Sequence, residues 1–246
     1  MFDNFSLPAI LISYVALLFS LSVHEASHAT AAFLLEDRTA QRMGRMTLNP
    51  IAHMDPIGTF LFPLIGMSTG IPFIGWAKPV PVNPVNLTRR LRMKTSYAMV
   101  AFAGPASNLV LSLVFFFITV FLIKASVVDI DQRNMLFESS LSGYAGIERL
   151  GTISSQTVLI ALSGQCILIN MGLAIFNMLP LGPLDGSSVL RAFIPDSWLP
   201  LYDRLQPFMQ IVLLILVFTG LFRIILYPIF MFLIGILGLL QTVFLG

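Results

Sequence analysis

Long apolar runs with few or no charges dominate this chain. A helix of about 20 residues crosses the hydrocarbon core of a bilayer, and five runs are long enough to do so. They are Leu7 to Leu35, Thr95 to Ile123, Gln156 to Leu181, Leu205 to Phe222, and Ile224 to Gly246. The pattern therefore predicts about five transmembrane helices.

A shorter apolar run, Pro56 to Ala77, has a different character because glycine and proline interrupt it throughout. These residues disfavour a straight helix, so we interpret the run as a re-entrant segment that can contain a β-hairpin. Basic residues flank the run on both sides: Arg38, Arg42 and Arg45 before it, and Lys78, Arg89, Arg90, Arg92 and Lys94 after it. Positive charges favour the cytoplasmic side, so both flanks are expected there and the run is not expected to cross.

Composition agrees with a polytopic, all-α membrane protein, because 57% of the residues are hydrophobic and only 11% are charged. The net charge of +2 is small and dispersed, which argues against nucleic acid as a partner. A single cysteine, Cys166, excludes an intramolecular disulfide and a cysteine-based zinc site.

The first apolar run contains the sequence His24-Glu25-Ala26-Ser27-His28. Residues four apart share one face of a helix, so both histidines can direct a ring nitrogen at one Zn²⁺ while Glu25 lies beside the metal. Ionisable groups within a membrane span are costly and indicate function. The alternative is a pair of histidines packed between helices. The motif favours zinc-protease chemistry.

A catalytic zinc ion usually has three protein ligands, so the two histidines need one more. His53, Asp55 and Asp185 are the candidates. Asp55 precedes a proline, as a helix N-cap often does, and His53 lies in a loop where a packing or hydrogen-bonding role is common. If Pro56 to Ala77 does not cross, two spans separate His28 from Asp185, which places them on the same side of the membrane. We therefore predict His24, His28 and Asp185 as the ligands, although Asp185-Gly186 is also typical of a turn or helix cap.

These motifs resemble the site-2 proteases, which are intramembrane zinc metalloproteases. The resemblance rests on the HEASH sequence at 24–28, on Asn177, Pro180 and the PLDG sequence at 183–186, and on shorter stretches at 47–50, 55–58, 75–84 and 103–108. It implies one zinc ion bound by His24, His28 and Asp185, with Glu25 as general base and Asn177 beside the site. The longest loop, Lys124 to Ser155, leaves no room for PDZ or CBS domains, as in the compact bacterial branch.

The expected function is zinc-dependent hydrolysis of peptide bonds in transmembrane or membrane-associated proteins. His24 lies about 25 Å along the helix from Leu7, so cleavage is expected near the cytoplasmic face of the cell membrane, with the N-terminus outside. We expect residues 1–190 to form the protease core and 191–246 a C-terminal transmembrane hairpin. No particular oligomeric state is predicted.

Two other functional classes fit parts of the pattern. An inactive scaffold would keep the fold without the chemistry, and an ion or proton transporter would use the buried ionisable groups as a path. Within the protease reading, Gly66 to Pro84 can offer a strand edge to an unwound substrate, or can be a simple interfacial loop. Asn177 can hold the substrate backbone or the developing oxyanion, or can join two helices.

Overall fold

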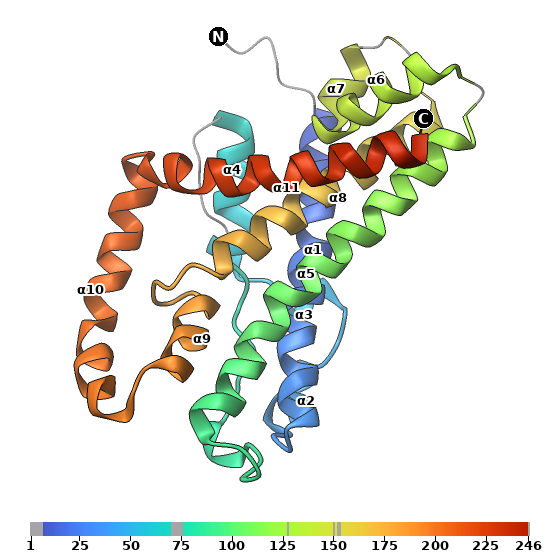
Figure 1. Ribbon diagram of the computed structural model, residues 1–246. Helices are drawn as coiled ribbons and strands as arrows, with labels where there is room; N and C mark the ends of the chain where they lie inside the picture. Colours follow the sequence, from blue (N-terminus) through green and yellow to red (C-terminus); the bar gives the residue numbers. More distant parts are fainter. Residues whose placement is uncertain (1–6, 70–75, 127, 150, 152–153, 246) are drawn as a thin grey trace.

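The computed structural model describes residues 7–69, 76–126, 128–149, 151 and 154–245, and no strand occurs among them. Figure 1 shows the helices in chain order. They are α1 (Leu7–Leu34), α2 (Thr39–Arg42), α3 (Pro50–His53), the π-helical turn η1 (Pro56–Leu61), α4 (Phe62–Thr69), the 3₁₀ turn η2 (Pro84–Asn86), α5 (Met93–Lys124), α6 (Ile130–Leu141), α7 (Tyr144–Arg149), α8 (Ser155–Asn177), α9 (Asp185–Phe193), the 3₁₀ turn η3 (Asp196–Trp198), α10 (Leu199–Phe218) and α11 (Leu221–Leu245).

Three long helices, α1, α5 and α8, pack against one another and form the centre of the molecule. In the described residues, five helical stretches are long and apolar enough to cross a membrane, which confirms the number predicted from the sequence. They are Leu7–Leu34, Met93–Lys124, Ser155–Asn177, Asp196–Val217 and Ile224–Leu245. The last two bury few of their side chains, so α10 and α11 lie largely outside the central packing.

The apolar core gathers at one end of the central helices, the upper end in Figure 1. There α6 and α7 pack on α8, and Phe137 of α6 lies against Phe116 of α5. The end of α11 joins this core through Leu237 and Leu245. The sequence predicted a loop between Lys124 and Ser155, and the structure has two helices, α6 and α7, within it, because a few buried apolar residues anchor an otherwise polar stretch.

The interrupted run Pro56 to Ala77 begins and ends at the same place. Asp55 caps η1 by accepting hydrogen bonds from the N–H groups of Ile57 and Gly58, as the Asp-Pro pair predicts. At the other end, the N–H of Trp76 donates to the carbonyl of Gly58 over 3.1 Å. The helical part, η1 and α4, ends at Thr69 and is too short to span, which agrees with a re-entrant segment. Residues 70–75, where part of the expected hairpin falls, lie outside the described residues.

An extended stretch at 77–83 follows and runs back along α1. Its far end is anchored by Asp37, a buried residue just after α1, whose Oδ2 accepts a hydrogen bond from the N–H of Asn83 over 2.7 Å. Burial raises the pKa of the Asp37 carboxyl, but hydrogen bonds from Thr39, Asn83 and Asn86 outweigh burial, and the pKa is lowered from its usual value. An ionised Asp37 thus holds this stretch in place.

Candidate metal centre

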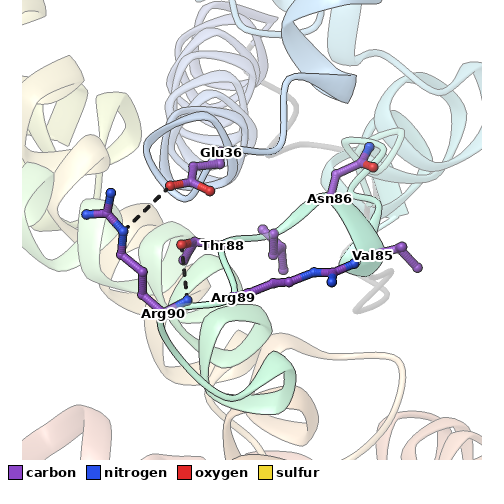
Figure 2. A pocket seen from close by; sticks show the side chains of 7 residues that line it. Glu36, Val85, Asn86, Thr88, Arg89 and Arg90 are labelled. Atoms are coloured by element: carbon purple, nitrogen blue, oxygen red, sulfur yellow. Dashed lines mark hydrogen bonds and ion pairs between the residues drawn. The ribbon is translucent and has the colours of Figure 1, made fainter.

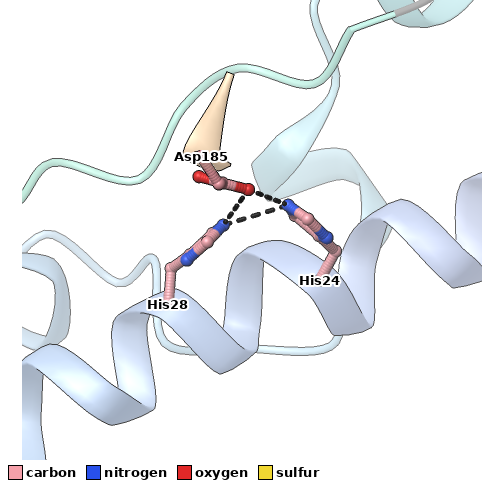
Figure 3. Close-up of side chains that lie close together, drawn as sticks. All are labelled: His24, His28 and Asp185. Carbon is pink, nitrogen blue, oxygen red and sulfur yellow. Dashed lines mark hydrogen bonds and ion pairs between the residues drawn. The ribbon is translucent and has the colours of Figure 1, made fainter. Parts of the chain in front are cut away.

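Three potential metal ligands meet where α1 passes the start of α9 (Figure 3). His24 and His28 lie one turn apart on α1, and Asp185 is the first residue of α9. The two Nε2 atoms are 3.0 Å apart, and Asp185 Oδ2 lies 3.2 Å from the first and 3.4 Å from the second. Among the described residues, no other group of three His, Cys, Asp or Glu side chains comes as close together.

The outer nitrogen of each histidine ring contacts an oxygen that accepts hydrogen bonds. His24 Nδ1 contacts the amide oxygen of Asn108, and His28 Nδ1 lies 2.8 Å from the main-chain carbonyl of Val100. These partners place the ring proton on Nδ1 in both histidines, as is common for metal-bound histidine. Each Nε2 therefore directs a lone pair toward the other Nε2 and toward the Asp185 carboxylate.

This donor set fits a zinc ion. Three lone-pair atoms that face one another repel unless a cation lies between them. In a tetrahedral zinc site with bonds of 2.0–2.1 Å, neighbouring ligand atoms are about 3.3 Å apart. The observed spacings of 3.0, 3.2 and 3.4 Å lie close to that value.

Gly104 lets α5 approach α1 at the level of the histidines. A Cβ at this position would overlap the rings of both His24 and His28. The place of this glycine at the metal centre was not predicted from the sequence. A close helix contact of this kind is typical of glycine in membrane helices, and here it also confines the two rings.

The first turn of α9 is held against the end of α8, and this holds Asp185 beside the histidines. A Cβ at Gly186 would overlap the carbonyl oxygens of Met178 and Leu179, so the Asp-Gly pair permits a close approach that no larger residue allows. The phenol of Tyr202 on α10 donates to the carbonyl of Ser187 over 2.8 Å.

The other end of α9 is fixed by charged groups. Arg191 forms a two-pronged ion pair with Asp203 of α10, with both N–O distances 2.9 Å. Lys94, in the first turn of α5, donates to the carbonyl of Ile194 over 2.8 Å and pairs with Asp196 over 2.6 Å. The short helix that presents Asp185 is therefore fastened to both α5 and α10.

Asp185 supplies the oxygen donor of this group. An ionised carboxylate only accepts hydrogen bonds, so its Oδ2 is a third lone-pair atom facing the two Nε2 atoms. A carboxylate with two imidazoles is a suitable donor set for zinc.

Glu25 is buried next to the histidines, and its Oε2 accepts a hydrogen bond from the main-chain N–H of Val80 over 2.9 Å. This contact places the extended stretch beside the metal centre. Two residues earlier, the N–H of Lys78 donates to the carbonyl of His53. Pro79 and Pro81 have no N–H, so residues 78–81 offer no unused N–H to a second strand. Pairing of these four residues with an unwound substrate would therefore use main-chain carbonyls, and the strand edge considered for Gly66 to Pro84 stays a prediction.

The remaining candidate residues lie outside the group of three. His53 is buried in α3, and its Nε2 contacts the carbonyl of Thr47 over 2.8 Å. Asp55 serves as the helix cap described above. Asn177, the last residue of α8, donates to the carbonyl of Leu173 in its own helix over 3.0 Å.

A separate surface hollow of about 600 Å³ contains none of these residues (Figure 2). It is lined by Glu36, Val85, Asn86, Leu87, Thr88, Arg89 and Arg90. Arg90 faces Glu36 across it over 4.0 Å, and both side chains are largely exposed. We interpret its arginines as anchors near anionic lipid headgroups.

Comparison with known proteins identifies the family. The model of "Peptidase family M50" matches residues 12–220, which include all of the residues discussed so far as ligands or catalytic groups. The chain belongs to peptidase family M50. This confirms the recognition of the site-2 protease family from the sequence, and it makes the chain a peptidase.

Two curated relatives of this M50 peptidase cover most of its length. "Putative zinc metalloprotease YwhC" of Bacillus subtilis (strain 168) is 34% identical over 216 residues, which are 87% of this chain and 83% of the relative. "Putative zinc metalloprotease Rip2" of Mycolicibacterium smegmatis is 26% identical over 207 residues, which are 84% of this chain and 66% of the relative. No solved structure shows a significant match.

Sequence reasoning missed part of the surroundings of the M50 site. From the sequence, Asn108 was part of the stretch at 103–108 without a role of its own at the metal centre, and Asn170 and Ser20 were not singled out. The structure joins these three buried side chains in one network that ends at His24. One signal could have pointed to this network: Asn108 and Asn170 each lie in a run expected to span the membrane, where a polar side chain needs a hydrogen-bonding partner.

Proposed function

We propose that this protein is a zinc-dependent intramembrane endopeptidase in which His24, His28 and Asp185 bind the metal and Glu25 is the general base. The substrates are transmembrane or membrane-associated proteins, cut near the cytoplasmic face. Both curated relatives carry the name of a zinc metalloprotease, which supports zinc as the metal.

One observation carries this proposal. The two Nε2 atoms and Asp185 Oδ2 converge within 3.4 Å, although His28 and Asp185 are separated by more than 150 positions in the sequence. Both rings expose the nitrogen that is free to bind metal, because Nδ1 of each is engaged elsewhere. This arrangement is better suited to a metal than to a packed helix contact, which would not bring together three acceptors.

The chemistry assigns distinct tasks to the two protein groups nearest the ligands. When bound, zinc supplies a Lewis acid that activates a water molecule and polarises the scissile carbonyl. Glu25 takes the proton of the attacking water and returns it to the leaving amine. Its Oε2 is held by Val80, so we assign Oε1 as the proton acceptor. Asn177 remains our candidate for holding the substrate backbone or the oxyanion, with its second amide hydrogen.

The proposal includes a domain division and an orientation. Residues 1–190 form the protease core and 191–246 a transmembrane hairpin, with the N-terminus outside. The two basic clusters lie at one end of the molecule: the N–H of Thr88 donates to the carbonyl of Leu35 over 2.7 Å, and α2 and the start of α5 both lie at the lower end in Figure 1. This supports a common cytoplasmic side.

Cysteine labelling tests this orientation. Single cysteines placed near Arg42 and near Arg92, in a chain whose Cys166 is replaced by alanine, should both react with a membrane-impermeant maleimide only from the cytoplasmic side. The cysteine-free chain is the control. Labelling of the two positions from opposite sides would refute the re-entrant interpretation.

Metal content and chelation test the function itself. We expect the purified protein to hold one zinc ion per chain, and we expect a chelator to abolish cleavage of a reconstituted transmembrane substrate until zinc is restored. An inactive scaffold would show no cleavage in any of these states. A transporter has no need of one tightly bound zinc ion per chain. A purified protein without stoichiometric zinc and without cleavage activity would therefore favour a scaffold or a transporter over a protease.

A further inference from the structure

A chain of three polar side chains connects the centre of the molecule to the metal centre. Ser20 lies on α1, Asn108 on α5 and Asn170 on α8, and each has an exposed fraction of 0%. Each lies within a helix long and apolar enough to span the membrane. Buried polar groups in such a place are costly unless they are paired, so the directions of their hydrogen bonds are tightly constrained.

The orientation of Asn170 follows from two fixed acceptors. Its Nδ2 lies 2.8 Å from the main-chain carbonyl of Cys166, which only accepts hydrogen bonds. Nδ2 also lies 2.8 Å from Ser20 Oγ, whose own hydrogen is donated to the carbonyl of Ala16 over 2.7 Å. Both partners require the NH₂ group of Asn170 on this side. Its Oδ1 therefore points to Asn108.

Asn108 receives its orientation from Asn170. Its Nδ2 donates to Asn170 Oδ1 over 2.7 Å, with a longer contact of 3.4 Å to the carbonyl of Ser20. The amide oxygen of Asn108 is then the atom that faces His24 Nδ1. An oxygen at this place requires the ring proton on Nδ1 and leaves the lone pair on Nε2, the atom directed at His28 and Asp185.

Reversal of the Asn108 amide would have the opposite effect. An NH₂ group facing Nδ1 would favour the tautomer with the proton on Nε2, which has no lone pair for a metal. The oxygen and nitrogen of an asparagine amide have nearly the same shape, so packing alone does not select between the two orientations. Only a hydrogen-bonding partner can, and Asn170 is the partner within 2.7 Å.

We propose that Asn170 is a positioning residue for the metal centre, which sets the metal-binding tautomer of His24 through Asn108 without touching metal or substrate. This inference rests on the proposed function only in taking His24 as a ligand. Outer hydrogen-bonding partners of metal-bound histidines typically contribute 10- to 100-fold to metal affinity, and we expect that range here although Asn170 acts one residue further out.

The first test measures zinc affinity by competition with a chelator in detergent. Asn170→Leu, which is close to asparagine in volume, should weaken zinc binding about 10- to 100-fold. Asn170→Ala, which only removes atoms, should do the same and keeps the comparison intact if leucine disturbs packing. Zinc affinity within twofold of wild type in the folded variants would overturn the proposal.

Thr119→Val is the matched control. Thr119 is equally buried on α5, and its hydroxyl lies 2.8 Å from Ser163 Oγ on α8, so the variant also removes a buried hydrogen bond between the same two helices. This pair has no link to His24. We expect Thr119→Val to lower thermal stability without changing zinc affinity. An equal loss of zinc affinity in this control would reduce Asn170 to a general packing role and overturn the proposal.

The second test removes the ambiguity that Asn170 is proposed to resolve. Asn108→Asp places an oxygen opposite His24 Nδ1 in either orientation, since both carboxylate atoms are acceptors. In that background Asn170→Ala should cause no further loss of zinc affinity. A further 10- to 100-fold loss would contradict the proposal, because a purely structural role predicts that the two effects add.

Zinc affinity is measured without any substrate, so the two proposals fail separately. If the predicted pattern of affinities holds and no substrate is cleaved, the assignment of Asn170 stands and the protease function fails. If cleavage is observed and the affinities of the Asn170 variants match wild type, the function stands and the role of Asn170 is wrong.

Discussion

Glu25→Gln is expected to keep the fold and one zinc ion per chain while proteolysis falls by a factor on the order of 10² to 10⁴. Glutamine has nearly the shape of glutamate and can still accept the hydrogen bond from Val80, so the extended stretch stays in place. It has no basic oxygen to take a proton from water. The measurement combines metal analysis of the purified variant with the initial rate of cleavage of a reconstituted transmembrane substrate.

Glu36→Gln provides the control for the same chemical change. Glu36 lies just past the end of α1, and its side chain is 59% exposed, with Arg90 as a distant partner at 4.0 Å. We expect this variant to cleave at the wild-type rate. Wild-type cleavage by Glu25→Gln would instead remove Glu25 from the mechanism, and loss of zinc in that variant would show that Glu25 is needed for metal binding.

The spanning helices were accessible from the sequence because hydropathy reports burial in lipid directly. The run Leu7 to Leu35 corresponds to a helix over Leu7–Leu34, and Thr95 to Ile123 to one over Met93–Lys124. In an apolar solvent the backbone must satisfy its own hydrogen bonds, so a long apolar run has few alternatives to a helix.

Helix ends were less predictable because hydropathy does not register proline geometry. The run Gln156 to Leu181 continues past Asn177, where α8 ends. Pro180 lacks an N–H and disfavours helix in the residue before it, so the chain leaves the helix while it is still apolar. Asp185 consequently lies on a separate short helix, α9, and not on the spanning helix itself.

The candidate site was partly accessible for a different reason. The HEASH motif is local, and a count of crossings sufficed to place Asp185 on the side of His28. The network of Ser20, Asn108 and Asn170 depends on which faces of three helices meet, and neither spacing nor hydropathy specifies that rotation. Likewise, only the folded chain shows that a main-chain carbonyl, that of Val100, fixes the ring of His28.

Asp185→Ala is expected to lose zinc and proteolysis together. The variant removes one of the three proposed ligand atoms, Oδ2, which lies 3.2 and 3.4 Å from the two histidine nitrogens. Removal of a direct ligand should weaken zinc binding by more than the 10- to 100-fold typical of an outer partner. Chelator competition and metal analysis of the purified variant measure the loss, and the cleavage assay should fall to background.

His53→Ala is the matched comparison, because His53 was the other candidate for the third ligand. Its ring is buried with an exposed fraction of 2% and contacts the carbonyl of Thr47, away from the group of three. The variant should therefore retain stoichiometric zinc even if the loss of packing lowers its thermal stability. The reverse pattern, with zinc retained in Asp185→Ala and lost in His53→Ala, would show that the third ligand is His53 and that the arrangement at α9 serves another purpose.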